Sequence, residues 1–420
     1  MLILMASLFC FLLVSGAPVY LFMFLPAIIA IFFTLPEPMT IANLSITNIQ
    51  NFSLIAIPLF VFTGNLCART GMAKYLIRFL DAAIGHITGG LAIAAILAAV
   101  FFAGITGSSS ADASAIGLLL IKPMMEAGYE RKFVTALLAA GATIGLIVPP
   151  SVPLIIYGFL AEESVEKLFI GGLIPALIIL VALGIYSVWY CKKRGYGRKT
   201  KANREERIKS FVKALPILGV LIIVVGTIYS GITTPTETAA LASIYALLIS
   251  IFIYRCLSWA LFKDIVLKTV SFTGMIFLII AGSMVMSFFL TYSQAPQKLT
   301  EFIISQNLSP VLFLFAINIL LLLLGIPIEP PPLMFMIIPI LAPILGNIGI
   351  DKIHFAIIFM INMQIAICSP PVGVNLFIIS AIAEAPTQEI FRSIIPFAVI
   401  LIVMLFVITY VPALSLFLVR

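Results

Sequence analysis

Long apolar runs, interrupted by short polar or Gly- and Pro-containing connections, make up most of this chain of 420 residues. A helix that crosses a bilayer needs about 20 apolar residues, so the runs leave room for about ten to twelve transmembrane helices. The pattern therefore predicts an all-α polytopic membrane protein in which residues 1–420 form a single domain. The expected spans are 2–15, 18–34, 52–68, 88–106, 131–147, 172–190, 213–231, 236–254, 269–291, 309–324, 353–367 and 393–415.

Two segments combine an apolar run with a polar beginning and differ from ordinary spans. Residues 104–126 begin Gly-Ile-Thr-Gly-Ser-Ser-Ser-Ala-Asp, and residues 325–345 begin Gly-Ile-Pro-Ile-Glu-Pro-Pro-Pro. Backbone that is broken at membrane depth is stable only where it is buried in protein or lines a cavity. We therefore expect two re-entrant hairpins, and Gly/Pro-interrupted segments of this kind commonly form the binding site of transporters.

The second half of the chain repeats the order of glycine, proline and charged residues found in the first half. A shift of 221 positions places the pair Pro149–Pro150 over Pro370–Pro371, and Arg131 over Lys352, without a gap. Further matches are Gly128 with Gly349, Glu163 with Glu384, and Pro175 with Pro396. We predict two structural repeats, at about 52–190 and 269–415, of the kind on which many transporters are built. Whether the second repeat is inverted depends on the number of spans, which the sequence leaves open.

Composition supports the membrane assignment and narrows the classes of function. Hydrophobic residues make up 62% of the chain and charged residues 10%, against about 45–50% and about 25% in soluble proteins. The net charge of +7 does not indicate a nucleic-acid partner, because ten of the 24 basic residues lie between Lys192 and Lys213. A basic run between two apolar spans marks a cytoplasmic loop, here 191–213, that contacts the surface of the lipid bilayer.

No motif indicates an enzyme, a cofactor or a transition-metal site. The five cysteines show no paired spacing, so we expect no disulfide. The two histidines, His86 and His354, are too few for a multi-histidine metal site within one chain, and neither lies in a catalytic motif. The chain also lacks a G-x-x-x-x-G-K-[ST] phosphate loop, so we do not expect it to hydrolyse ATP.

The polar cluster at the start of the first hairpin has the chemistry of an ion or solute site. Hydroxyl groups supply neutral oxygens and a carboxylate supplies a fixed negative charge. Unwound backbone adds carbonyls that suit sodium and helix N-termini that suit anions. The candidate residues are Gly107, Ser108, Ser109, Ser110 and Asp112. The alternative is a plain helix cap, since Ser and Asp are common at that position.

Each proline pair predicts a helix break, because proline removes a backbone donor and clashes with the preceding turn. At membrane depth such a break frees carbonyl groups for an ion, whereas at the membrane surface it forms only a tight turn. The candidate residues are Pro149, Pro150 and Ser151 in the first half, and Ser369, Pro370, Pro371, Gly373 and Asn375 in the second. Tyr157, seven residues after the first pair, is a further candidate for contact with the solute, as is Asn375.

Acidic residues within spans are costly in lipid and usually functional. Glu329, which follows Gly325 in the second hairpin, therefore joins Asp112 as a candidate site residue. Glu237 begins a span after Thr-Thr-Pro-Thr, where an N-terminal cap and a transport role are equally compatible with the sequence.

Motifs along the whole chain resemble, in order, those of the TRAP (tripartite ATP-independent periplasmic) transporter large permease family, the DctM-like proteins. In the first half these are Ala-Ile-Pro-Leu-Phe at 56–60, Gly-Ser-Ser-Ser-Ala-Asp at 107–112, Gly-Tyr at 128–129 and Pro-Pro-Ser at 149–151. In the second half they are Gly-Ile-Asp at 349–351 and Pro-Pro-Val-Gly-x-Asn-Leu-Phe at 370–377.

The resemblance implies a sodium-coupled symporter of the bacterial inner membrane with an elevator-type mechanism, in which a domain carrying both hairpins moves against a scaffold. It implies two partners, a small four-helix membrane subunit and a periplasmic substrate-binding protein, and an organic-acid (carboxylate) substrate. Na⁺, the expected coupling ion, binds near the hairpin tips in this family. The matching positions are Gly107, Ser108, Ser109, Pro149, Pro150, Gly325, Ser369, Pro370 and Gly373.

Three alternatives are weighed against this interpretation. A stand-alone ion-coupled anion transporter of related architecture would work without a binding protein. A non-transporting scaffold or channel subunit has no need of duplicated polar hairpins. A membrane enzyme lacks a plausible catalytic set in this sequence.

Overall fold

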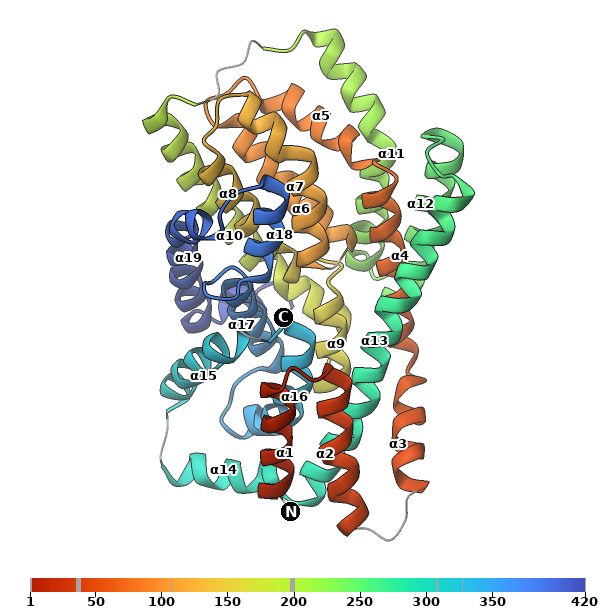
Figure 1. The fold of residues 1–420 in the computed structure, drawn as a ribbon, viewed down its shortest axis with the longest axis vertical. Coiled ribbons are helices and arrows are strands. Elements are labelled where there is room, and N and C mark those ends of the chain that lie inside the picture. The colour runs from red at the N-terminus through yellow and green to blue at the C-terminus, as the bar shows by residue number, and fades with distance from the viewer. Residues whose placement is uncertain are drawn as a thin grey trace.

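The computed structural model describes residues 2–34, 39–106, 108–196, 201–306, 309–326 and 328–419, and regular structure in these ranges is helical (Figure 1). The helices of the first half are α1 (Leu2–Val14), α2 (Val19–Thr34), α3 (Met39–Ile49), η1 (Phe52–Ile55), α4 (Ala56–Arg69), α5 (Ala73–Ile84), α6 (Gly90–Thr106), α7 (Ser109–Glu126), α8 (Arg131–Thr143), η2 (Ile144–Leu146), α9 (Val152–Ala161) and α10 (Val165–Arg194). Those of the second half are α11 (Arg204–Tyr229), α12 (Pro235–Leu248), η3 (Ile249–Ile253), α13 (Trp259–Tyr292), α14 (Ala295–Ser305), α15 (Pro310–Gly325), α16 (Pro330–Asn347), α17 (Lys352–Ile367), α18 (Val374–Ala383), α19 (Thr387–Tyr410) and α20 (Ala413–Leu416).

The expected all-α polytopic membrane fold is confirmed. Among the described residues, seven helical segments are long and apolar enough to cross a bilayer: Phe52–Arg69, Val165–Arg194, Arg204–Tyr229, Pro235–Ile253, Trp259–Tyr292, Pro330–Asn347 and Thr387–Tyr410. Shorter apolar helices supply the rest of the membrane-embedded structure.

The basic segments of the sequence gather at one end of the molecule, which we call the basic end. Arg69 pairs with Asp264 at 2.6 Å, and the ring of Tyr75 stacks on that of Tyr254 at a centroid distance of 4.7 Å. These contacts join the end of α4 to the start of α13, and the start of α5 to the residue that follows η3. By the positive-inside rule the basic end is cytoplasmic. The predicted loop 191–213 is shorter in the structure, because α10 continues to Arg194 and α11 begins at Arg204.

Two of the expected spans are instead the first arms of hairpins. The predicted span 88–106 is α6, and α7 turns back beside it after Ser108; the predicted span 309–324 is α15, which α16 follows in the same way. The start of α6 and the end of α7 both lie near the end of α10. A Cβ added to Gly89 would be 3.2 Å from that of Cys191, and the ring centroid of Tyr129 is 5.2 Å from that of Tyr196. Both arms therefore enter from the basic end.

Two more expected spans, 131–147 and 353–367, are halves of broken helices. α8 has 13 residues, or about 20 Å at 1.5 Å per residue, which is too short for a hydrocarbon core of about 30 Å. After a break at the proline pair, α9 completes the crossing. In the second half α17 and α18 are arranged in the same way around Pro370–Pro371.

The two halves share one order of elements, and the second half is inverted. Helices α6 to α10 correspond to α15 to α19. α8 begins at the basic end, where Glu130 lies 3.5 Å from Arg194. α17 begins at the opposite end, where Lys352 donates a hydrogen bond to the carbonyl of Ala161 at the end of α9. The three long helices between the halves, α11, α12 and α13, are an odd number of crossings, which produces the inversion.

A one-residue difference separates the halves at the break. α9 and α18 begin 222 positions apart, one more than the proline pairs. The structure therefore pairs Glu162 with Glu384, which end these helices in the left-handed conformation at φ of 56° and 49°. The ungapped alignment, which paired Glu163 with Glu384, is one residue out of register after the break. The extra residue lies before α18, where Gly373 has a positive φ of 42°.

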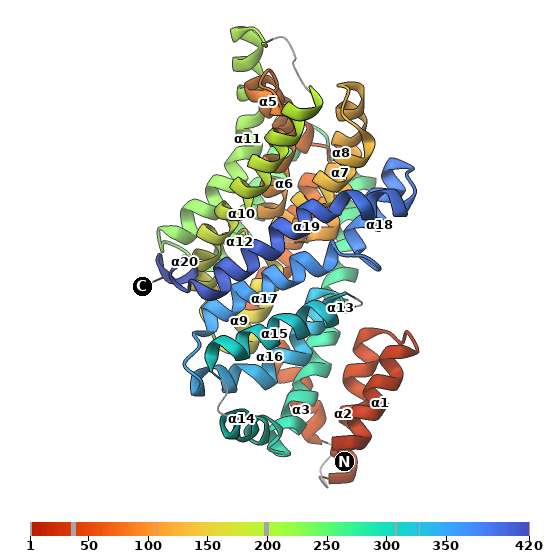
Figure 2. The same ribbon diagram turned by 90° about the vertical axis from the view of Figure 1, so that its left-hand side faces the viewer.

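The remaining helices surround these repeats. α13 packs against α2, α3 and α4, and α12 packs along α4 (Figure 1). Figure 2 shows α1 and α2 as a pair on one flank of the molecule. α5 and α14, which the sequence did not predict, lie across opposite ends. α13 also contacts α16, so the second hairpin rests on this long helix.

Candidate functional site

A cavity of about 130 Å³ lies where both hairpin tips and both helix breaks meet α13. Of the site residues predicted from the sequence, five line it: Ser108, Ser109, Ser110, Glu329 and Asn375. Its other lining residues are Val19, Leu146, Val152, Pro153, Phe272, Met275, Ile276, Ile279, Pro330, Pro331, Pro332, Ile367 and Val374. Residues 272–279 lie near the middle of α13, which places the cavity near mid-membrane.

Four helix N-termini converge on this cavity. Its lining includes the first residue of each helix concerned: Ser109 of α7, Val152 of α9, Pro330 of α16 and Val374 of α18. Two helix C-termini reach it as well, through Leu146 at the end of η2 and Ile367 at the end of α17. N-termini carry partial positive charge and C-termini carry partial negative charge with free carbonyl groups. The inverted repeat thus brings both kinds of helix end to one place.

The serines of the first hairpin tip form part of the cavity wall. Ser108 is the extended residue before α7, and its carbonyl accepts the backbone N–H of Asp112 at 3.0 Å. Its side chain does not cap the helix by a hydrogen bond; the Ser108 and Ser110 hydroxyls lie 3.3 Å apart. Asp112 is fully buried in the first turn of α7 and does not line the cavity, a position in which a carboxylate stabilises a helix N-terminus. Gly107 lies outside the described residues.

Asn375 connects the two repeats at the cavity. Its Nδ2 donates a hydrogen bond to Ser109 Oγ at 2.7 Å and approaches the carbonyl of Ala139 at 3.5 Å. The side chain is almost fully buried, and its Oδ1 has no hydrogen-bond partner among the described atoms. A buried amide oxygen without a donor is costly, so this atom is suited to a cation or a donor that enters the cavity.

The second hairpin tip presents an acid. Glu329 precedes Pro330, the first residue of α16, and its side chain forms no cap hydrogen bond. The side chain is exposed and lies along the cavity wall. Gly325, at the end of α15, has a packing role: a Cβ there would be 2.7 Å from that of Ala366 in α17, so only glycine allows this approach.

The proline pairs form the breaks but do not line the cavity, and a role for them in ion binding stays a prediction. Pro149 and Pro150 are buried, whereas Pro370 and Pro371 are exposed. Ser151 caps α9: its Oγ donates to the carbonyl of Leu146 at 2.8 Å and accepts the N–H of Leu154 at 3.4 Å. In the second break, Ser369 Oγ donates to the carbonyl of Ile365 at 2.7 Å.

Two other candidates have structural partners. Tyr157 is fully buried and donates its hydroxyl to the carbonyl of Lys352 at 2.8 Å, and it does not line the cavity; its contact with the solute stays a prediction. Glu237 forms a capping box with Thr234, and its carboxylate accepts the Thr234 N–H at 2.8 Å. Of the two alternatives for Glu237, the structure shows the helix cap.

The apolar wall of the cavity was not predicted from the sequence. Phe272, Met275, Ile276 and Ile279 lie on one face of α13, in a long and regular apolar helix whose pattern does not distinguish a cavity-facing side. Val19, at the start of α2, completes this wall. These residues can be recognised as cavity-lining only in the folded structure, where α13 passes the point at which the two repeats meet.

A buried chain of amides behind the second hairpin was also missed as a structural element. Asn362 Nδ2 donates to Asn318 Oδ1 at 2.7 Å, and Asn318 Nδ2 donates to Thr409 Oγ1 at 3.2 Å. These bonds join α15, α17 and α19. Buried polar side chains are costly unless they are hydrogen-bonded, so a bonded network of this kind favours one arrangement of the neighbouring helices.

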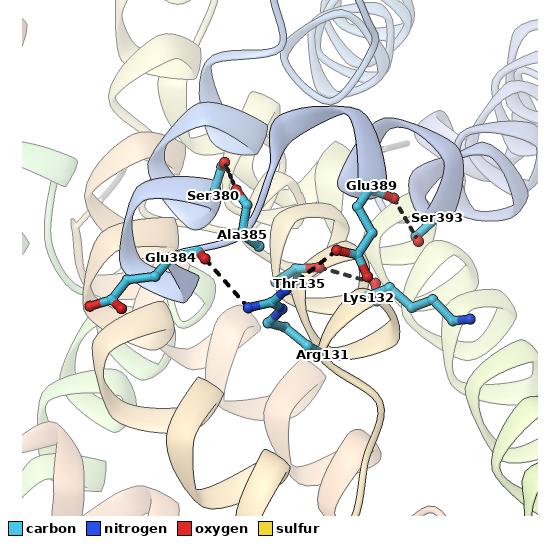
Figure 3. Close-up of polar contacts among 8 residues, drawn as sticks. All are labelled: Arg131, Lys132, Thr135, Ser380, Glu384, Ala385, Glu389 and Ser393. Carbon is cyan, nitrogen blue, oxygen red and sulfur yellow. Dashed lines mark hydrogen bonds and ion pairs between the residues drawn. The ribbon is translucent and has the colours of Figure 1, made fainter.

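A cluster of charged contacts ties the repeats together at the basic end (Figure 3). Arg131, at the start of α8, donates to the carbonyl of Glu384 at 3.4 Å and pairs with the carboxylate of Glu389 at 3.5 Å. Ser380 Oγ donates to the carbonyl of Ala385 at 2.6 Å and so secures the turn between α18 and α19.

Comparison with known proteins identifies the family. Residues 5–414 match the family described as "Tripartite ATP-independent periplasmic transporter, DctM component". The chain belongs to this family of TRAP large permeases. It is therefore a transport protein of the inner membrane and not an enzyme.

Several TRAP permeases are similar over most of the chain. The sialic acid TRAP transporter large permease SiaM of Vibrio cholerae is 38% identical over 370 residues, which are 88% of this chain and 87% of that protein. The C4-dicarboxylate permease DctM of Pseudomonas aeruginosa is 37% identical over 87% of this chain and 86% of its own. The isethionate permease DctMQ of Oleidesulfovibrio alaskensis is 36% identical over 97% of this chain and 65% of its own length.

Two solved structures share the fold of this TRAP permease. The Alcanivorax borkumensis YdaH transporter has a TM-score of 0.66 at 12% identity, covering 90% of both chains. Neisseria gonorrhoeae MtrF has a TM-score of 0.63 at 13% identity, covering 89% of this chain and 84% of its own. At such identities the likeness concerns the fold alone.

Proposed function

We propose that this permease imports an organic acid by sodium-coupled symport. A periplasmic substrate-binding protein delivers the acid, and a small four-helix membrane subunit completes the tripartite system. The carboxylate of the solute and the sodium ions bind in the cavity between the two hairpin tips. The convergence of four helix N-termini and two helix C-termini on that cavity carries the proposal.

The helix N-termini support an anionic substrate. The N-termini of α7, α9 and α18 offer unpaired backbone N–H groups and partial positive charge, which bind anions without a basic side chain. α16 begins with three prolines, which have no N–H, so it contributes its helix dipole alone. No Lys or Arg lines the cavity among the described residues. Recognition of a carboxylate therefore falls to the helix ends.

The oxygen atoms at the cavity support sodium as the coupling ion. Sodium is a hard cation that is held by carbonyl, hydroxyl and carboxylate oxygens, and discontinuous transporter helices commonly supply them. Asn375 Oδ1 lacks a partner, Ser108 and Ser110 add hydroxyls, and Glu329 adds a carboxylate. The C-termini at Leu146 and Ile367 add carbonyl groups. These are the atoms we assign to the ion.

The names of the relatives agree with an anionic solute and do not define one. Sialic acid and C4-dicarboxylates carry carboxylates, whereas isethionate carries a sulfonate. A sulfonate presents oxygen atoms to helix N-termini as a carboxylate does. Carboxylates are the proposed class, and isethionate belongs in the same substrate panel.

The size of the cavity supports movement of the hairpins. At about 130 Å³ it holds the volume of about four water molecules and lies below the about 300–1,000 Å³ of most ligand pockets. A solute of several carbon atoms needs a wider space. We propose that the hairpins, with α8, α9, α17 and α18, move as a body against α13, in the manner of an elevator.

Uptake by proteoliposomes tests the proposal. The permease is reconstituted with its small membrane subunit, and candidate binding proteins loaded with labelled organic acids are added under an inward sodium or potassium gradient. Uptake that requires both sodium and the binding protein supports the proposal. Uptake driven by sodium without any binding protein indicates a stand-alone transporter, and uptake that is indifferent to sodium contradicts the coupling.

A double variant tests the site. Ser108→Ala with Ser109→Ala removes two hydroxyls from the first hairpin tip and should weaken the sodium dependence of uptake while the protein still enters the membrane. Ser187→Ala is a matched control, because that buried hydroxyl bonds to the carbonyl of Leu183 within α10 and does not line the cavity. Unchanged sodium activation in the double variant contradicts the assignment of these serines.

A further inference from the structure

A second hollow lies on the outer flank of the first hairpin, between α6 and α10. This groove has a volume of about 550 Å³ and its walls are almost entirely apolar side chains. Ile93, Ile96 and Leu97 of α6 form one wall. Leu180, Val181, Gly184, Ile185 and Val188 of α10 form the other wall, and Trp189 and Lys192 mark one end.

The groove arises because the two helices touch at the basic end and then separate. At the contact, a Cβ added to Gly89 would be 3.2 Å from the Cβ of Cys191. Further along α10, a Cβ added to Gly184 would meet nothing within 4 Å. The hollow is therefore open at Gly184, and the α10 residues on either side, Val181 and Ile185, are exposed.

The dimensions match one leaflet of a bilayer. From Leu180 to Lys192 the helix rises about 18 Å at 1.5 Å per residue, close to half of a hydrocarbon core of about 30 Å. A volume of about 550 Å³ over this length gives a mean cross-section of about 30 Å². A helix about 10 Å across has a cross-section of about 80 Å², so the groove is too narrow to enclose a partner helix.

The end of the groove has the chemistry of the cytoplasmic membrane surface. Trp189 is half exposed, at the position where aromatic residues meet lipid headgroups. Lys193 Nζ lies 5.3 Å from the centre of the Trp189 ring, and Lys192 lines the groove. Arg194 is turned to Glu130, at 3.5 Å. Neither lysine takes part in the ion pairs found within the described ranges.

We propose that this groove is a binding site for an anionic phospholipid. One acyl chain lies between α6 and α10, and the phosphate lies beside Lys192 and Lys193. Basic pockets between transmembrane helices on the cytoplasmic side bind anionic headgroups, and each Lys near the surface strengthens binding about fivefold. Because α6 is an arm of the first hairpin, the lipid fills the flank of the element that carries the serines of the transport site.

Tryptophan fluorescence tests this site directly, because the chain contains two tryptophans. Trp259→Phe leaves Trp189 as the single reporter at the groove. The variant is reconstituted in phosphatidylcholine vesicles that contain a small fraction of lipid with brominated acyl chains, which quench tryptophan on contact. The brominated lipid is either phosphatidylglycerol or phosphatidylcholine at the same fraction. We expect phosphatidylglycerol to quench Trp189 several times more strongly.

Two sets of substitutions locate the effect. Gly184→Leu fills the groove and should abolish the preference, whereas Gly226→Leu is the matched control, since a Cβ at Gly226 in α11 also meets nothing within 4 Å. Lys192→Gln with Lys193→Gln should bring the quenching by the two lipids close to equal while the apolar groove remains.

Three results would overturn the proposal. Equal quenching by both lipids means that Trp189 contacts only the lipids of the bulk bilayer. A preference that survives Gly184→Leu places the lipid elsewhere. Loss of the preference when the small membrane subunit is added shows that a protein helix, and not a lipid, occupies the groove in the complex.

Discussion

Lys352 and Arg131 occupy equivalent positions in the two repeats, and each reaches across to the end of a helix in the other repeat. Lys352 Nζ donates to the carbonyl of Ala161 at 2.9 Å, at the end of α9. Arg131 donates to the carbonyl of Glu384 at 3.4 Å, at the end of α18. A cation at a helix C-terminus satisfies free carbonyls and complements the helix dipole. The repeats are thus fastened to each other at both membrane faces.

Replacing Lys352 should loosen the fastening opposite the basic end. Lys352→Met removes a hydrogen bond from a charged donor, and we expect a loss of stability of about 1.5–3 kcal/mol. Lys352→Arg keeps the charge and the donor and should lose much less. Thermal unfolding of the purified protein in detergent measures both variants. Equal melting temperatures for Lys352→Met and the wild type would show that this hydrogen bond contributes nothing to stability.

The bond between Asn375 and Ser109 should couple the two repeats during sodium binding. Asn375→Leu removes the amide that holds the serine and the unpartnered oxygen at the cavity. We expect the sodium concentration for half-maximal uptake to rise by about tenfold, which corresponds to about 1.4 kcal/mol. In a double-mutant cycle, adding Ser109→Ala to Asn375→Leu should have less effect than Ser109→Ala alone. Strictly additive effects would argue against coupling through this bond.

The charge of Glu329 should matter for sodium. Glu329→Gln keeps the size of the side chain and removes the negative charge from the cavity wall, so sodium should activate uptake only at higher concentration. Glu329→Asp retains a carboxylate and should lie nearer to wild type. The readout is the sodium dependence of uptake with saturating substrate-loaded binding protein. A Gln variant with wild-type sodium dependence would remove Glu329 from the ion site.

The capping box at the start of α12 should contribute to stability. The carboxylate of Glu237 accepts the backbone N–H of Thr234 at 2.8 Å and its hydroxyl at 3.0 Å, and the Thr234 hydroxyl accepts the backbone N–H of Glu237 at 3.3 Å. Thr234→Ala should therefore cost about 1 kcal/mol of stability.

Glu237→Gln should cost less, because glutamine can also accept the Thr234 N–H in a capping box. Thermal unfolding of the purified protein in detergent measures both variants. A melting temperature for Thr234→Ala equal to that of the wild type would mean that the cap does not contribute to stability.

The sequence predicted those parts of the site that depend on unusual residues. Ser108, Glu329 and Asn375 stood out because polar residues beside glycine and proline are rare within apolar runs. The wall formed by α13 was not predictable, because Ile276 has the same pattern as any lipid-facing residue. The structural partner of Tyr157 was not predictable, because a hydroxyl near a break can donate to a backbone carbonyl as well as to a solute.

The fold was predicted in class and repeat but not in the role of each helix. Apolar length alone identified 88–106 and 309–324 as spans, although these segments return to the face they came from. Length cannot distinguish a crossing from a hairpin arm, since both are apolar helices surrounded by lipid or protein. The break of α8 and α9 was visible as Pro149–Pro150, but the shortness of each half became informative only in the structure.

The inversion of the second repeat has a consequence for how the chain enters the membrane during synthesis. Two segments of similar design insert with opposite orientation in one polypeptide, so their shared design cannot by itself set the orientation of each. The cluster between Lys192 and Lys213 extends from the end of α10 into the first turns of α11, between the first repeat and the helices that lead to the second. Because this cluster stays in the cytoplasm, it places the end of the first repeat on the cytoplasmic side. It also makes the helices that lead to the second repeat start from that side. A single stretch between the halves therefore orients both.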